Sequence, residues 1–145
     1  MPSFLAVLAA LILLPIGALH LLWATGVSWP FRSEAHLARS VIGTPFDLPR
    51  PRKVALTLMA AGAILMAGLI PLAVGGLLET GVPDPLLRWA LMAEAGVFVL
   101  RGGYGYSPFM ERAAPLEPFR PLNRRVFNPL ILGLGAICVA LLALT

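Results

Sequence analysis

The chain has 145 residues, of which 59% are hydrophobic and only 12% are charged. Soluble domains carry about 25% charged residues, so this composition excludes a water-soluble globular domain. A disulfide framework is excluded as well, because Cys138 is the single cysteine. The composition predicts an integral membrane protein. At about 20 apolar residues per crossing, the length has room for about four helices.

Four apolar segments follow one another along the chain and define a single transmembrane domain over residues 1–145. The predicted helices cover residues 4–25, 54–78, 85–102 and 126–144. The third helix is the least apolar, since Arg88 and Glu94 interrupt it. No segment alternates polar and apolar residues as a barrel strand does. The expected fold is therefore all-α, an integral membrane four-helix bundle.

The basic residues gather in two loops, and this distribution predicts the orientation in the membrane. Ten of the eleven lie in or beside residues 26–53 and 103–125: Arg32, Arg39, Arg50, Arg52, Lys53, Arg101, Arg112, Arg120, Arg124 and Arg125. Positively charged loops remain in the cytoplasm. Both loops are expected there, with both termini outside. Anionic headgroups account for the charge, so no nucleic-acid partner is expected.

The first basic loop contains one further predicted helix. Between Ser33 and Ile42, apolar residues recur at helical spacing beside Glu34, His36 and Arg39. This pattern is typical of a short helix that lies on the membrane surface.

Glu94 is the acidic residue within a predicted span. A charge at the centre of a membrane helix costs about 2.5–3.5 kcal/mol on insertion scales, so such a residue marks a functional site by default. One interpretation is a proton or cation carrier, or an acid for catalysis. The other is a buried, hydrogen-bonded structural carboxyl group. The sequence leaves both open.

A second group of candidate residues is expected near the cytoplasmic ends of the helices. The predicted topology brings five of them to the same membrane depth: His20, Trp23, Arg101, Tyr104 and Asn128. Together they predict a polar ligand-binding pocket that opens toward the cytoplasm. Taken singly, each has a simpler explanation, such as a histidine bonded to a carbonyl group or an arginine that extends to the headgroups.

Motifs for catalysis and for cofactors do not occur in the sequence. His20 and His36 are the only histidines, and neither has neighbours at the spacing of metal ligands. There is no nucleophile motif, phosphate loop or dinucleotide fingerprint. The sequence motifs therefore indicate no catalytic residue and no metal site, and they identify no cofactor.

Several short motifs resemble a known family. They are His20-Leu-Leu-Trp23-Ala-Thr-Gly26 with Trp29-Pro30, the segment Ala38 to Gly43, Arg101-Gly102, Pro118-Phe119, Leu122-Asn123-Arg124 and Asn128-Pro129-Leu130. Together they are similar to the small four-helix bacterial membrane family called domain of unknown function 3995. The chain departs from that family's Asp, Tyr, Ser and Cys at Asn123, Phe127, Asn128 and Ile131. The resemblance implies the four-helix architecture and a location in the inner (plasma) membrane of a bacterium. It also directs attention to His20, Trp23 and Arg101, without naming a reaction.

The favoured function is a non-enzymatic one, either an accessory subunit of a larger membrane complex or a binder of a small amphipathic ligand at the cytoplasmic face. Small residues in the second helix, such as Ala60, Gly62 and Gly68, favour close contact with another helix. The expected partners are the lipid bilayer and either a membrane protein or another copy of the chain. An alternative is a proton-coupled transporter that acts as an oligomer with Glu94 as the carrier. A membrane enzyme that uses His20 or Glu94 as acid or base ranks third.

Overall fold

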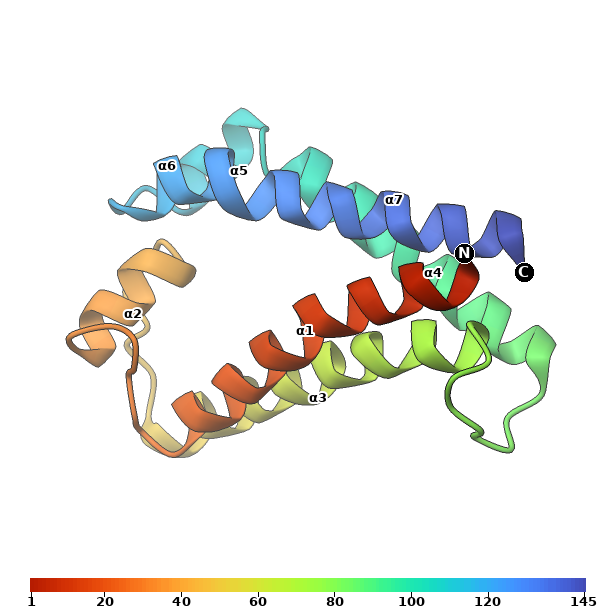
Figure 1. The fold of residues 1–145 in the computed structure, drawn as a ribbon. Coiled ribbons are helices and arrows are strands. Elements are labelled where there is room, and N and C mark those ends of the chain that lie inside the picture. Colours follow the sequence, from red (N-terminus) through yellow and green to blue (C-terminus); the bar gives the residue numbers. More distant parts are fainter.

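The computed structural model describes residues 1–145 and is all-helical, without a β-strand (Figure 1). In chain order the elements are α1 (Pro2–Ala24), α2 (Glu34–Val41), α3 (Arg50–Val74), α4 (Asp84–Tyr104), α5 (Pro108–Ala113), α6 (Phe119–Leu122), the π-helical turn η1 (Asn123–Phe127) and α7 (Asn128–Leu144). The last three elements follow one another directly and form one continuous helix, Phe119–Leu144. The predicted all-α class is confirmed.

Three helices are long and apolar enough to cross a membrane: Pro2–Ala24, Arg50–Val74 and Phe119–Leu144. This finding indicates a membrane protein, as the composition predicted. The fourth long helix, α4, has 21 residues. It is more polar than the other three because it contains Arg88, Glu94 and Arg101.

The four long helices are arranged as two hairpins. In the first hairpin α1 packs along α3, and in the second α4 packs along α7. Figure 1 shows the two hairpins close together near the chain termini and diverging toward α2. At the end near the termini they share a buried apolar cluster: Ala6, Leu91, Ala95, Cys138 and Leu141.

Glycines allow the close approach of α1 and α3. A Cβ atom added to Gly17 would lie 2.7 Å from Cδ2 of Leu65. One added to Gly68 would lie 2.7 Å from Cδ2 of Leu14. Each helix thus presents a glycine to a leucine of the other, which is the role of small residues in membrane helix pairs.

The two hairpins also contact each other at the opposite end, through their long connections. The amide nitrogen of Leu116 donates a hydrogen bond of 3.0 Å to the carbonyl oxygen of Gly43. Nε of Arg39 donates one of 3.2 Å to the carbonyl oxygen of Glu117. These bonds hold α2 in contact with α6. Figure 1 shows both short helices at the end of the molecule away from the chain termini.

The short helix predicted between Ser33 and Ile42 is present as α2. Ser33 is its N-cap, and its Oγ accepts a hydrogen bond of 3.2 Å from the amide nitrogen of His36. This is the usual way in which a serine satisfies a free amide group in the first turn.

The second predicted helix differs from the structure at both of its ends. The helix predicted over 54–78 runs from Arg50 to Val74 instead. It starts earlier because Pro51 lies in the first turn of the helix. The backbone N–H groups of a first turn have no acceptor within the helix, so proline, which lacks this group, is tolerated there. It ends earlier because Gly76 has a φ of 72°, and the amide nitrogen of Leu77 bonds back to the carbonyl oxygen of Leu72 at 2.9 Å.

The second basic segment contains more helix than the sequence suggested. The helix predicted over 126–144 begins at Phe119, because its charged first turns are helical although they are not apolar. The short helix α5 lies within the predicted loop 103–125 as well. Its N-cap is Ser107, whose Oγ accepts a hydrogen bond of 3.2 Å from the amide nitrogen of Met110.

Candidate functional site: a pocket between the first hairpin and its short helix

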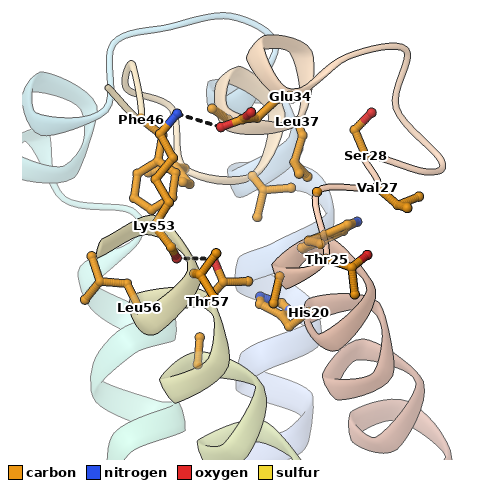
Figure 2. A pocket seen from close by; sticks show the side chains of 18 of the residues that line it. His20, Thr25, Val27, Ser28, Glu34, Leu37, Phe46, Lys53, Leu56 and Thr57 are labelled. Carbon is orange, nitrogen blue, oxygen red and sulfur yellow. Dashed lines mark hydrogen bonds and ion pairs between the residues drawn. The ribbon is translucent and has the colours of Figure 1, made fainter. Parts of the chain in front are cut away.

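A cavity of about 510 Å³ lies where the end of α1, the start of α3 and α2 come together (Figure 2). Its apolar wall includes Leu37, Val41, Ile42, Phe46 and Leu56. Its polar lining includes His20, Thr25, Ser28, Glu34, Arg50, Lys53 and Thr57. The volume is within the range of small-molecule sites, and a mostly apolar lining with a few polar groups is typical of them.

The loop after α1 is held in place by local contacts that shape one side of the pocket. Gly26 has a φ of 98°, a conformation that L side chains rarely adopt, so the chain turns there at the end of α1. Trp23 then fixes the loop, because its Nε1 donates a hydrogen bond of 2.8 Å to the carbonyl oxygen of Trp29. These contacts close the α1 side of the cavity.

A row of aromatic rings connects α1 to α2 beside the pocket. The ring centroids of His20 and Trp23 are 4.6 Å apart, and those of Trp23 and Phe31 are 6.2 Å apart. Phe31 in turn lies 5.7 Å from His36, edge to face. These distances are those of favourable aromatic pairs, so the row positions α2 over the ends of α1 and α3.

The tautomer of His20 follows from its hydrogen bond. Nδ1 lies 2.8 Å from the carbonyl oxygen of Ile16. A carbonyl oxygen can only accept, so Nδ1 carries the proton and donates it. In the neutral ring Nε2 is then an acceptor. The histidine that lines the pocket therefore has one nitrogen committed to the chain and one available as an acceptor.

An ion pair joins α2 to α3 at the pocket. Nζ of Lys53 lies 2.6 Å from Oε1 of Glu34, and the two side chains are 25% and 62% exposed. Nζ also lies 5.9 Å from the centroid of the Phe46 ring. Because the pair is partly exposed, it contributes at most about 1 kcal/mol. Arg50, which also lines the pocket, has no ion pair and no side-chain hydrogen bond.

Arg101 lies in the second hairpin, in a separate polar cluster. Its Nη1 donates a hydrogen bond to Oδ1 of Asn128, and its Nη2 donates one to Oδ1 of Asn123, each at 3.3 Å. Nδ2 of Asn123 donates in turn to the carbonyl oxygen of Gly105 at 2.9 Å. Both asparagines are buried. The cluster therefore ties the end of α4 to the start of α7.

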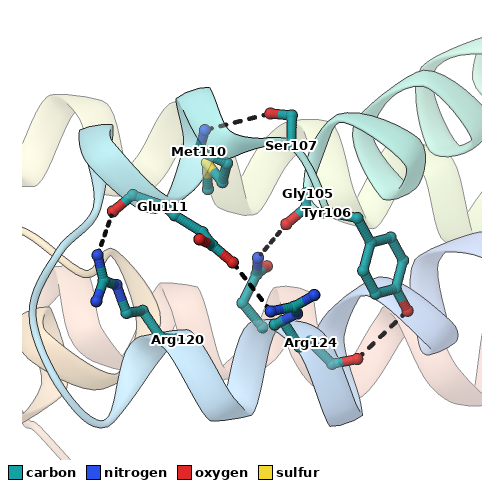
Figure 3. A network of polar contacts seen from close by, with 8 residues as sticks. Gly105, Tyr106, Ser107, Met110, Glu111, Arg120 and Arg124 are labelled. Atoms are coloured by element: carbon teal, nitrogen blue, oxygen red, sulfur yellow. Dashed lines mark hydrogen bonds and ion pairs between the residues drawn. The ribbon is translucent and has the colours of Figure 1, made fainter.

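A second set of polar contacts packs α5 and the residues just before it against α6 and η1 (Figure 3). Nη1 of Arg124 forms an ion pair of 3.1 Å with Oε1 of Glu111. Arg120 donates a hydrogen bond of 3.0 Å to the carbonyl oxygen of Glu111. Tyr106 donates one of 3.3 Å to the carbonyl oxygen of Arg124. These contacts fold the second long connection onto its own hairpin.

Glu94 lies where α4 packs against α7, away from the pocket. It is 8% exposed, and the nearby Cys138 donates to its Oε1 over 3.8 Å. Its Oε2 has no hydrogen-bond partner, and no ion pair reaches it. The carboxyl group therefore lies next to the apolar cluster at the end near the chain termini.

The structure divides the candidate residues among four places. His20 and Trp23 line the pocket. Arg101 and Asn128 are hydrogen-bonded to each other in the second hairpin. Glu94 is buried beside Cys138 of α7, and Tyr104 is 50% exposed. Sequence reasoning missed the pocket's charged and hydroxyl groups, which belong to Thr25, Ser28, Glu34, Arg50, Lys53 and Thr57. The sequence contained a sign of the charged groups: Glu34 lies on the polar face of the predicted short helix, and Arg50 and Lys53 lie in the basic stretch before the next long helix.

These features define an all-helical membrane protein with a pocket of ligand size beside its first hairpin. The chain belongs to the family described as Protein of unknown function (DUF3995), whose model matches residues 13–138. The match includes α2, α3 and α4 entirely, about half of α1 and most of α7, so it confirms the resemblance seen in the motifs. No curated protein and no solved structure matches the chain.

Proposed function

We propose that the protein is a non-enzymatic, four-span inner-membrane protein that binds a small amphipathic ligand at the cytoplasmic face. The observation that carries this proposal is the cavity of about 510 Å³, which combines an apolar wall with a polar and charged lining. Apolar walls with a few convergent polar groups are what a molecule with a head and an apolar tail requires.

The proposed topology includes α4 as the fourth span. With 21 residues and a rise of about 1.5 Å per residue, α4 is about as long as the hydrocarbon core is thick. Its polar side chains have inward partners, since Arg101 bonds to Asn123 and Asn128 and Glu94 is buried. The positive-inside rule then supports placing the pocket in the cytoplasmic half, because Arg50 and Lys53 lie beside it.

Native mass spectrometry of the protein purified in a mild detergent tests the proposal. A bound small molecule is expected in the spectrum of the parent protein. Ala60→Phe should remove it, because Ala60 lines the pocket and the ring would fill the space. Met59→Phe is the matched control, since Met59 is 69% exposed and outside the pocket. A ligand that survives Ala60→Phe contradicts the proposal, and a stoichiometric protein partner would favour the accessory-subunit alternative.

A proton-coupled transporter with Glu94 as its carrier is the second candidate. The observation that favours it is the buried carboxyl group, one oxygen of which has no hydrogen-bond partner. Four helices enclose little space for a substrate path, so this function requires an oligomer. A homodimer with pH-dependent uptake in proteoliposomes, abolished by Glu94→Gln, would support it over the ligand-binding proposal.

A further inference from the structure

The side-chain hydrogen-bond donors that remain free in the pocket indicate the chemistry of its ligand. We infer that the ligand is a single-chain anionic amphiphile taken from the bilayer, with its carboxylate or phosphate head at Arg50 and Lys53. The inference rests on the proposed function, and it adds the charge of the head group, the residues that hold it and the source of the molecule.

Most donors around the pocket are already used by the chain itself. Hydroxyl groups of three residues donate to backbone carbonyl oxygens: Thr25 to Leu22 at 2.7 Å, Ser28 to Phe31 at 3.3 Å and Thr57 to Lys53 at 2.8 Å. The ring nitrogens do the same, since Trp23 bonds to Trp29 and His20 to Ile16. The side-chain donors that remain for a ligand belong to Arg50 and Lys53.

The net charge of the pocket lining also favours an anionic head group. Arg50 has no acidic partner, while Lys53 has one, the 62% exposed Glu34. The lining therefore carries two positive charges and one negative charge. An anionic head group accepts hydrogen bonds from both cations and neutralises the excess positive charge. A neutral head group accepts the hydrogen bonds but leaves the charge in place. A cationic head group neither accepts these hydrogen bonds nor neutralises the charge.

The apolar part of the pocket continues onto the outer surface of the helices. Leu56, on the candidate membrane span α3, lines the pocket and is 47% exposed. Exposed apolar side chains on a membrane-spanning helix face lipid tails. A tail that lies in the pocket can therefore enter sideways from the bilayer, and this is why the source is a lipid-derived molecule rather than a water-soluble anion.

Glu34 has a specific role in this arrangement. Oε1 of Glu34 forms an ion pair of 2.6 Å with Nζ of Lys53. An anionic head group therefore competes with Glu34 for the same ammonium group. Removal of the acid should then tighten ligand binding. A purely structural role for the ion pair predicts the reverse, because the loss of the pair would loosen α2 over the pocket.

Quenching of Trp23 by brominated fatty acid tests the inference in detergent. The protein carries Trp29→Phe and Trp89→Phe, so that Trp23, which lines the pocket, is the single tryptophan of the chain. The probes are dibromostearate, lysophosphatidate with the same chain, the neutral glycerol monoester and a cationic choline ester. A protein that retains only Trp89, which is 65% exposed on α4, measures quenching caused by partition into the micelle.

Both anionic probes, or one of them, are expected to quench Trp23 at concentrations about tenfold below the neutral and cationic probes. Arg50→Gln should weaken anionic quenching about fivefold, since a partly exposed ion pair contributes up to about that factor. Glu34→Gln should strengthen it by a similar factor. Arg52→Gln and Glu111→Gln should leave it unchanged, because both residues are outside the pocket. If Arg50→Gln fails to fold, the change in anionic quenching in Glu34→Gln is sufficient to test the inference.

The outcomes separate the two levels of the proposal. Equal quenching by all four probes, or weaker anionic quenching in Glu34→Gln, overturns the anionic head group and leaves an amphipathic pocket. Preference for one anionic probe identifies the head group as carboxylate or phosphate. If no probe quenches Trp23 more than Trp89, both the anionic ligand and the proposed pocket function are wrong.

Discussion

Arg101 on α4 donates a hydrogen bond from Nη1 to Oδ1 of Asn128, the first residue of α7, over 3.3 Å. The same guanidinium group reaches Asn123, five residues earlier. In a regular α-helix two residues five apart differ by about 140° around the axis. The π-helical turn between them changes this, since its hydrogen bonds join residues five apart. The turn therefore brings both amide oxygens to one guanidinium group.

Arg101→Lys is expected to lower the free energy of unfolding in detergent by about 1.5–3 kcal/mol, the contribution of hydrogen bonds to a charged group. One ammonium group cannot reproduce the planar fork that serves two acceptors. Thermal unfolding followed by circular dichroism measures the loss. Arg112→Lys is the control, because Arg112 is exposed and has no side-chain hydrogen bond. Equal stability of both variants would show that the fork is not required.

Replacement of Glu94 should depend on the charge of the new side chain. Glu94→Gln keeps the shape and the polar group, so the free energy of unfolding should change by less than about 0.5 kcal/mol. Glu94→Lys places a charge where no acidic partner lies nearby, and it should lose about 2.5 kcal/mol or more. Expression yield and thermal unfolding report both effects. A Gln variant as unstable as the Lys variant would indicate that the carboxyl group itself is structurally required.

Two glycines on the first hairpin should respond to alanine with opposite signs. At Gly17 a Cβ would lie 2.7 Å from Leu65, so Gly17→Ala should destabilise the protein by about 1–3 kcal/mol. At Gly62 nothing lies within 4 Å of an added Cβ. Gly62→Ala should therefore stabilise the helix by up to about 1 kcal/mol. Thermal unfolding of the two variants in the same detergent provides the comparison, and a loss at both positions would refute the packing argument.

Hydropathy located the long helices, but it marked their apolar portion rather than their ends. The residues Arg50 to Lys53 and Phe119 to Arg125 are helical although they are charged or contain proline. A basic first turn next to the headgroups has no hydropathy signal, so the sequence could not separate it from a loop. The π-helical turn was equally hidden, because it is stabilised by Arg101 from another helix.

The candidate site was only partly predictable for a similar reason. His20 and Trp23 were found because they are three residues apart on one helix face. The rest of the pocket depends on where α2 lies, and this is set by bonds from Arg39 and Gly43 to residues more than 70 positions later. Contacts of that sequence separation leave no local pattern. Equal membrane depth likewise could not show that Arg101 belongs to the other hairpin.

Accessibility of introduced cysteines tests the proposed topology. Ser33→Cys and Ala113→Cys should resist a membrane-impermeant thiol reagent in intact cells, because the basic connections are expected in the cytoplasm. Thr80→Cys, in the short exposed turn between α3 and α4, should react. The native Cys138 is buried and gives a low background. Labelling of the first two positions, and not the third, would reverse the orientation.

The pairing of each long helix with a partner from its own half of the chain has a consequence for biogenesis. Because α1 packs along α3 and α4 along α7, each hairpin completes most of its contacts before or without the other. Membrane insertion can then proceed in two steps, with the first pair assembled while the second is still being translated. The chain should accordingly tolerate a break at the exposed Gly81, and two separately expressed halves should reassemble into one complex.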